Sequence, residues 1–176
     1  MKPGKHFVEL DKSRHERKTF ECGREELNAF IRSSAVRHRE AGISKTLVLA
    51  AECEEEAKAD ICSFYTLSHT EIKRETLSDS LAKKLPRYPV PVMLIAQLAV
   101  HKDAQGQGLG KITLIRALKH CLEINAHLPS YAVVVDALDD GVQAFYEQYG
   151  FRPLDHHGQR RVRLFMPMKI VTQLFS

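Results

Sequence analysis

A glycine-rich turn between two apolar segments places the strongest constraint on the fold. The turn reads QGQGLG over residues 105–110, after LIAQLAV (94–100) and before KITLIRALKHCLEI (111–124). The apolar run before the turn predicts a strand that is buried on both faces. The apolar repeat after the turn predicts a helix from about Leu109 to Asn125. Glycines at the junction allow another group to approach the backbone closely.

Counting glycines excludes two familiar phosphate-binding motifs at this turn. A Walker A loop would require glycine where the chain has Gln105, and serine or threonine where it has Ile112. A dinucleotide-binding GxGxxG that begins at Gly106 would require glycine where the chain has Lys111. The remaining pattern still predicts an anion site, because the first N–H groups of the next helix have no intrahelical partner. A tight turn without a ligand is the alternative.

Periodicity elsewhere predicts further strands and helices. Strands are expected at residues 5–10, 44–52, 60–68, 92–100, 131–138 and 161–170. Helices are expected at residues 22–42, 70–85, 109–125 and 139–151. The second rests on Leu77, Leu81 and Leu85, which are four residues apart, and the third has an apolar stripe of Leu109, Ile112, Ile115, Leu118 and Leu122. This order predicts an α/β (α+β) chain with a mixed central sheet and helices on both faces. Because no linker interrupts the 176 residues, a single domain over residues 1–176 is expected.

Composition argues against several other classes of protein. No apolar run approaches the roughly 20 residues of a membrane span. The charged start lacks an apolar signal segment, so the cytoplasm is the expected location. The four cysteines form no CxxC pair and the nine histidines form no HExxH. Neither a disulfide framework nor a metal site is therefore expected.

The net charge of +4 is concentrated in three basic clusters. The candidates for contact with nucleic-acid phosphates are Arg32, Arg37, Arg39, Lys83, Lys84, Arg87, Arg160, Arg161 and Arg163. Basic clusters bind nucleic acid when they gather on one surface. Three solvated faces without a ligand are the alternative, which composition alone favours.

Two motifs together resemble the signatures of the GCN5-related N-acetyltransferase (GNAT) family. The pattern Gln-x-x-Gly-x-Gly after a strand ending in LAV resembles the family's acetyl-coenzyme A signature. The stretch AFYEQYGF at residues 144–151 resembles the family's second, aromatic signature, and the two stand in the family's order. The resemblance implies the GNAT fold, with a mostly antiparallel mixed sheet. It also implies an N-acetyltransferase that uses acetyl-coenzyme A as acetyl donor.

The resemblance also implies roles for individual residues. The predicted cofactor-binding residues are Leu98, Ala99, Val100, Gln105, Gly106, Gln107, Gly108, Leu109, Gly110, Lys111, Asp139 and Phe145. Tyr146 matches the family's catalytic tyrosine, whose phenol protonates the leaving thiolate; an ordinary pKa of about 10 suits this donor. A core aromatic is the alternative role of Tyr146. Two positions depart from relatives: Asp139 stands in place of asparagine, and Gln97 stands where related toxins often have arginine.

Longer stretches resemble the toxin branch of this family, which occurs in bacterial toxin–antitoxin pairs. They read FECGREELNAFIRSSAVRHREAGISKTLVL, SFYTLS and LPRYPVPVMLIAQLAV. The resemblance implies acetylation of the α-amino group of aminoacyl-tRNA, which blocks translation. It also implies a ribbon-helix-helix antitoxin as partner and a homodimer. The alternatives are an acetyltransferase of a small amine or protein N-terminus, and an interaction module without activity.

Overall fold

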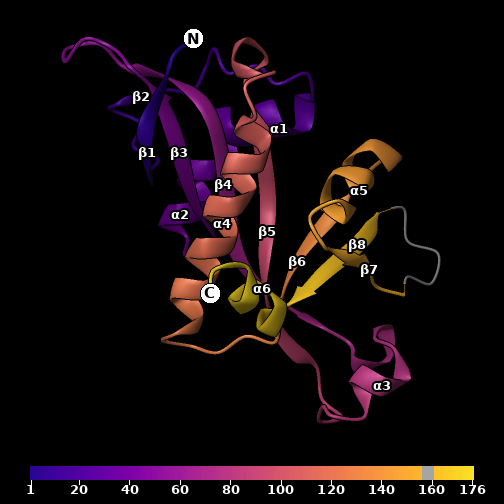
Figure 1. The fold of residues 1–176 in the computed structure, drawn as a ribbon. Helices are drawn as coiled ribbons and strands as arrows, with labels where there is room; N and C mark the ends of the chain where they lie inside the picture. Colours follow the sequence, from indigo (N-terminus) through magenta and orange to yellow (C-terminus); the bar gives the residue numbers. More distant parts are fainter. Residues whose placement is uncertain (156–160) are drawn as a thin grey trace. The chain divides into compact units, whose positions relative to one another are not determined.

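The computed structural model describes residues 1–155 and 161–176. The chain divides into two compact units (Figure 1). One comprises Met1–Ser68 and Ala96–Ala117, and the other comprises His69–Ile95 and Leu118–Ser176. The prediction of a single domain over residues 1–176 stays a prediction.

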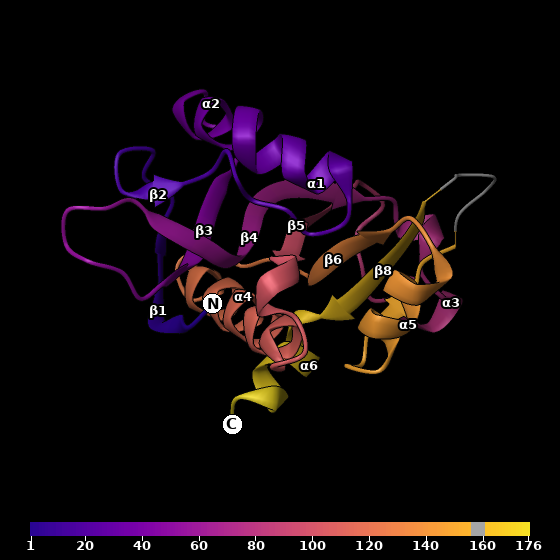
Figure 2. The same ribbon diagram turned by 90° about the horizontal axis from the view of Figure 1, so that it is seen from above.

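The first unit is built on antiparallel strands. β1 (Pro3–Glu9) pairs with β3 (Lys45–Ala51), and β3 pairs with β4 (Ala59–Ile72). The short β2 (His15–Glu16) runs parallel to the start of β4. The last residues of β5 (Val90–Val100) also belong to this unit. Figure 2 shows α1 and α2 across one side of β3 and β4, with α4 on the opposite side.

The first helical stretch contains one widened turn. α1 (Glu25–Ala29), the π-helical turn η1 (Phe30–Ser34) and α2 (Ala35–Glu40) follow one another directly, which confirms the helix predicted over residues 22–42. Its inner side chains share a buried cluster with residues of β3, β4 and β5. The cluster contains Phe20, Phe30, Ile31, Ala35, Val48, Ile61, Phe64 and Ala99. Burying these apolar side chains stabilises the first unit.

Helix α4 (Leu109–Asn125) has the predicted bounds, but part of its predicted apolar stripe is wrong. Ile112 and Ile115 are 45% and 37% exposed. The fully buried positions include the smaller Thr113 and Ala117 instead. Hydropathy favours isoleucine, whereas close packing of a helix against a sheet selects side chains that fit the available space.

The second unit contains the parallel strand pair. β6 (Ala132–Ala137) runs parallel to β5 and antiparallel to β8 (Val162–Pro167), and β7 (Arg152–Pro153) pairs with β8. α5 (Asp140–Glu147) follows β6, and α6 (Met168–Leu174) follows β8. Residues 168–170 were predicted as strand and are helical instead. The predicted α/β class, with mixed and mostly antiparallel strands, is confirmed.

The helix predicted over residues 70–85 is mostly wrong. β4 continues to Ile72, η2 (Arg74–Thr76) is a 3-10 turn, and α3 covers only Asp79–Ala82. The leucines that suggested a helix still reach a buried cluster: Leu77 belongs to it, and Leu81 and Leu85 pack against it. The spacing of these leucines correctly predicted that they are buried or packed against a buried cluster. They reach that cluster from short turns instead of a helix, because tertiary packing can override local helix preference.

No helix in the described ranges is both long enough and apolar enough to span a bilayer.

A buried hydroxyl pair attaches α4 to β4, and it generates the first prediction. Thr113 Oγ1 lies 2.9 Å from Ser63 Oγ and 2.6 Å from Leu109 O, and both hydroxyl side chains are fully buried. Replacing Thr113 by valine preserves shape but leaves Ser63 without this partner. We expect Thr113→Val to lower the free energy of unfolding by about 1–3 kcal/mol.

Chemical denaturation of both variants checks this expectation. The control is Thr19→Val, because Thr19 is exposed and surface changes usually stay within about 0.5 kcal/mol. Equal stability of the two variants would contradict the role given to the buried pair.

Candidate functional site

The glycine turn exposes its backbone between two buried anchors. Ala104 is fully buried and Leu109 is nearly so, and both belong to one small apolar cluster. Between them, Gly106 and Gly108 have φ values of +82° and +78°. No heavy atom lies within 4 Å of a Cβ added at either glycine. The two glycines are therefore required by backbone conformation, and the space beside them is open.

The positive end of helix α4 lies at this open turn. The first hydrogen bond that closes the helix runs from Ile112 N–H to Gly108 O, at 3.2 Å. The N–H groups of Leu109, Gly110 and Lys111 precede it, and such groups have no intrahelical acceptor. The helix dipole and the exposed Lys111 add positive potential. This end of α4 can therefore hold a pyrophosphate.

The glutamine side chains of the turn stabilise its shape. Gln105 Nε2 donates to Val100 O at 3.0 Å and to Cys22 O at 3.4 Å. Gln107 Nε2 donates to Ala104 O at 3.3 Å. These bonds attach the turn to the end of β5. The side-chain amides of Gln105 and Gln107 are thus bonded within the protein, and their predicted contacts with pyrophosphate stay predictions.

The predicted cofactor-binding residues Leu98, Ala99 and Val100 form the end of β5. The β5–β6 ladder pairs Met93–Ile95 with Val133–Val135, so Leu98, Ala99 and Val100 lie beyond it along the strand. Alternation along the strand places Leu98 and Val100 on the side opposite Ala99. Leu98 and Val100 are only half-buried, whereas Ala99 is buried. This edge suits the amide groups of a pantetheine arm, which can bond to a strand backbone.

Gln97 is a polar residue of β5 to which the sequence assigned no role of its own. Its Oε1 atom is buried and accepts no hydrogen bond from any residue in the described part of the chain. Buried polar atoms normally have a partner. Gln97 is therefore a further candidate for contact with a bound molecule, next to the predicted strand edge.

In the second unit, Tyr146 lies in an aromatic cluster on α5. The side chain is 6% exposed, and its ring centroid lies 5.2 Å from that of Phe145 and 5.5 Å from that of Phe151. Burial raises the pKa of the Tyr146 phenol, and the negative charge of Asp136 raises that pKa further. Tyr146 therefore remains protonated at neutral pH, as a proton donor requires.

The neighbouring predictions at Asp139 and Phe145 have structural explanations. Asp139 is the N-cap of α5, and its side chain accepts a hydrogen bond from Val142 N–H at 2.8 Å. Aspartate performs this role as well as asparagine. Phe145 packs edge-on against both Tyr146 and Tyr149. Asp139 and Phe145 thus hold the start of α5 and the Tyr146 ring in place, while their predicted cofactor contacts stay predictions.

A bidentate ion pair neutralises Asp136. Arg163 donates from Nε and Nη2 to the two carboxylate oxygens at 2.8 and 3.0 Å, between registered positions of β6 and β8. Its charge opposes the field that Asp136 exerts on Tyr146. Arg163, which the sequence placed among the nucleic-acid contacts, is therefore occupied within the second unit. Sequence alone offered no signal for this pair, because the partners are far apart in the chain.

The other candidates for phosphate contact differ in whether their side chains already have a bonding partner. Arg32 lies 3.5 Å from Glu21, and Arg39 lies 2.6 Å from Glu9. Arg37 donates to a backbone carbonyl, and Arg161 also has an interaction partner. Arg160 lies outside the described residues. Of the nine candidates, Lys83, Lys84 and Arg87 have exposed side chains with no ion pair or side-chain hydrogen bond to a described residue.

Burial raises the thiol pKa of three of the four cysteines, Cys22, Cys62 and Cys121. Cys62 and Cys121 are buried, and burial raises the pKa of the Cys121 thiol to about 12. Cys121 therefore remains a neutral thiol at physiological pH. Within the described ranges, no group of three or more His, Cys, Asp or Glu side chains could hold a metal ion.

The comparisons with known proteins agree with this geometry. A family model described as Acetyltransferase (GNAT) domain matches residues 91–172, which include the glycine turn and Tyr146. A protein of Mycobacterium tuberculosis (strain ATCC 25618 / H37Rv) named tRNA-acetylating toxin is 28% identical over 133 residues, covering 76% of each chain. Residues 91–172 thus match the acetyltransferase (GNAT) domain, and the chain is similar to a tRNA-acetylating toxin.

Solved structures extend the similarity over nearly the whole chain. The structure of AtaT complexed with acetyl-methionyl-tRNAfMet superposes with a TM-score of 0.85 at 26% identity, covering 97% of this chain and 99% of that one. The structure of AtaTR bound with AcCoA gives a TM-score of 0.82 at 27% identity, covering 97% and 98%. The predicted GNAT fold, the acetyltransferase activity with acetyl-coenzyme A and the resemblance to the toxin branch are confirmed.

The open glycine turn generates the second prediction. An alanine at Gly108 adds both backbone strain and a methyl group in the open space beside the turn. We expect Gly108→Ala to raise the Kd for acetyl-coenzyme A at least tenfold, equivalent to losing one hydrogen bond to a charged group. Calorimetric titration measures the change.

Gly42→Ala is the matched control for backbone strain. Gly42 has φ +75° and an equally open surround, but it follows α2 instead of the turn. Both variants should lose about 1 kcal/mol of unfolding free energy, and only Gly108→Ala should lose cofactor affinity. Equal cofactor affinity of the two variants would argue against pyrophosphate binding at this turn.

Proposed function

We propose that this chain is a toxin that transfers an acetyl group from acetyl-coenzyme A to the α-amino group of an aminoacyl-tRNA and so blocks translation. The similarity to AtaT in its complex with acetyl-methionyl-tRNAfMet carries this conclusion, because it extends over 97% of this chain and 99% of that one. The relative named tRNA-acetylating toxin supports the same acceptor. The open anion site and the buried tyrosine supply matching chemistry in the chain itself.

We assign acetyl-coenzyme A to the glycine turn and the end of β5. The backbone of Gly106–Lys111 holds the pyrophosphate, and the strand edge of Leu98, Ala99 and Val100 holds the pantetheine arm. A backbone N–H at this edge polarises the thioester carbonyl as its oxygen gains negative charge. Binding both ends of the donor fixes the carbonyl for attack, which lowers the entropic part of the barrier.

We assign Tyr146 as the general acid. The neutral α-amine of the acceptor attacks the carbonyl carbon, the C–S bond breaks, and the amine loses a proton to solvent. The phenol of Tyr146 donates its proton to the departing sulfur, so that a thiol leaves instead of a thiolate. Because burial raises the pKa of Tyr146, its proton is present throughout the neutral pH range.

We further propose that the chain forms a homodimer in the cytoplasm and is neutralised by a ribbon-helix-helix antitoxin. The resemblance of its sequence to the toxin branch supports these partners. A protein of Sinorhizobium fredii (strain NBRC 101917 / NGR234) named Probable toxin TacT, 24% identical over 181 residues, supports the same branch.

The proposed acceptor gives the third prediction. Incubating the chain with acetyl-coenzyme A and a full set of charged tRNAs should yield N-acetylated aminoacyl ends on at least one tRNA, detected by mass spectrometry after nuclease digestion. The same reaction with free amino acids should yield no product, since they lack the tRNA. Acetylation of a small amine or a protein N-terminus, with no acetylated aminoacyl-tRNA, would overturn the proposal.

The acid role of Tyr146 gives the fourth prediction. Tyr146→Phe should lower kcat by about 10²–10⁴-fold, the usual contribution of a positioned acid, with the Kd for acetyl-coenzyme A unchanged. The ratio of wild-type to variant kcat should stay constant between about pH 6 and pH 9, because a raised pKa keeps Tyr146 protonated below its ordinary pKa of about 10.

Tyr149→Phe is the control for this measurement. Tyr149 packs against Phe145 in the same aromatic cluster at 5.3 Å, so its change tests the packing without removing the assigned acid. Its kcat should match the wild type. Equal losses in the two variants, or a ratio that falls steadily with pH, would remove the acid role from Tyr146.

A further inference from the structure

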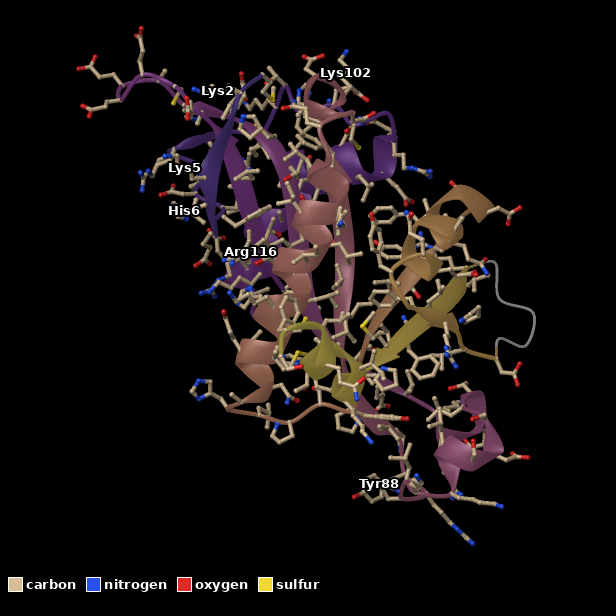
Figure 3. All side chains as sticks on the ribbon, viewed as in Figure 1. Lys2, Lys5, His6, Tyr88, Lys102 and Arg116 are labelled. Atoms are coloured by element: carbon tan, nitrogen blue, oxygen red, sulfur yellow. The ribbon has the colours of Figure 1, made fainter. Side chains whose placement is uncertain are left out.

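Tyr88 is unusual because its aromatic ring lies on the surface. It is 67% exposed, and every other Phe or Tyr among the described residues is buried or half-buried. The side chain lies on the segment that joins α3 to β5 and projects away from the ribbon (Figure 3). The exposed face of this ring is available to stack on a flat ligand.

Unpaired cations surround Tyr88 in the chain. Lys83, Lys84 and Arg87 are exposed, and none of their side chains bonds to another residue in the described ranges. The other basic candidates with described contacts already bond to carboxylates or to backbone carbonyls. Cations without partners can bind phosphates without first breaking an ion pair.

Buried residues hold this segment in place at both ends. Ala82 precedes it and Val90 follows it, and both belong to the same apolar cluster. Between them, Pro86 and Pro89 restrict the backbone on both sides of Tyr88, and a residue before proline is confined to extended conformations. A platform restricted in this way loses little conformational entropy when it binds.

The combination identifies the chemistry of the partner. An aromatic face beside free lysine and arginine side chains is the pattern that binds single-stranded nucleic acid, because each base has a stacking face and each nucleotide a phosphate. An apolar protein segment would instead need an apolar surround, and the exposed neighbours of Tyr88 between Ala82 and Val90 are three cations and two prolines. The proposed acceptor presents its reactive amine at an unpaired RNA end.

We propose that Tyr88 is a stacking platform for an unpaired base at the 3′ end of the acceptor tRNA, with Lys83, Lys84 and Arg87 binding the adjacent phosphates. This inference rests on the proposed function and deepens it by naming the part of the RNA that this surface binds. Tyr88 acts in binding and takes no part in the chemical step.

Tyr88→Ala should raise the KM for aminoacyl-tRNA about tenfold, within the range that alanine substitution of one stacked aromatic produces. The KM for acetyl-coenzyme A should not change. Tyr88→Trp should restore the KM for tRNA, since tryptophan keeps a stacking face without the hydroxyl. The control is Leu128→Ala, which removes another exposed apolar side chain, 61% exposed, from the loop after α4 and should leave both KM values unchanged.

A binding comparison locates the contact on the RNA. Tyr88→Ala should weaken binding of deacylated tRNA with an intact 3′ end about tenfold, and it should not affect the same tRNA lacking its unpaired 3′ nucleotides. Equal weakening for both RNAs, or none for either, would overturn the inference while wild-type acetylation of aminoacyl-tRNA leaves the proposed function standing. If the wild type acetylates no aminoacyl-tRNA, the proposed function fails and this inference fails with it.

Discussion

The attachment of the glycine turn to buried structure on both sides is the constraint on which the rest of the proposed donor site depends. Ala104 and Leu109 are buried, Gln105 bonds to Val100 O, and Thr113 contacts Ser63. These contacts fix where α4 begins. Because the helix start is fixed, its free N–H groups point at one place, and they need no reorganisation when an anion binds.

The acid role proposed for α5 depends on the electrostatic environment of the Tyr146 phenol. Burial and the carboxylate of Asp136 both raise the pKa of Tyr146, and Arg163 limits the second effect by pairing with that carboxylate. A phenol that never ionises near neutral pH is a dependable proton source. The same ion pair explains why Arg163 is poorly placed to serve RNA, although it stands in a basic stretch of sequence.

Prediction from sequence succeeded where the chemistry is local. The glycine turn, the bounds of α4 and the aromatic stretch around Tyr146 all follow from contiguous residues, because turn conformation and helix termination depend on immediate neighbours. It was wrong over residues 70–85, where leucine spacing suggested a helix. There Leu77, Leu81 and Leu85 reach one apolar cluster from short turns, and that outcome depends on residues distant in the chain.

The sequence by itself determined the conformation of the glycine turn and the start of α4, because both depend on adjacent residues. Only the tertiary structure decided which cations are free. Arg32, Arg39 and Arg163 look equivalent to Lys83, Lys84 and Arg87 in the sequence, but the first three face carboxylates. The sequence likewise did not distinguish Tyr88 from the buried aromatic residues. The exposure of a side chain and its ion pairs arise when segments distant in the chain pack together. No local sequence pattern can therefore predict them.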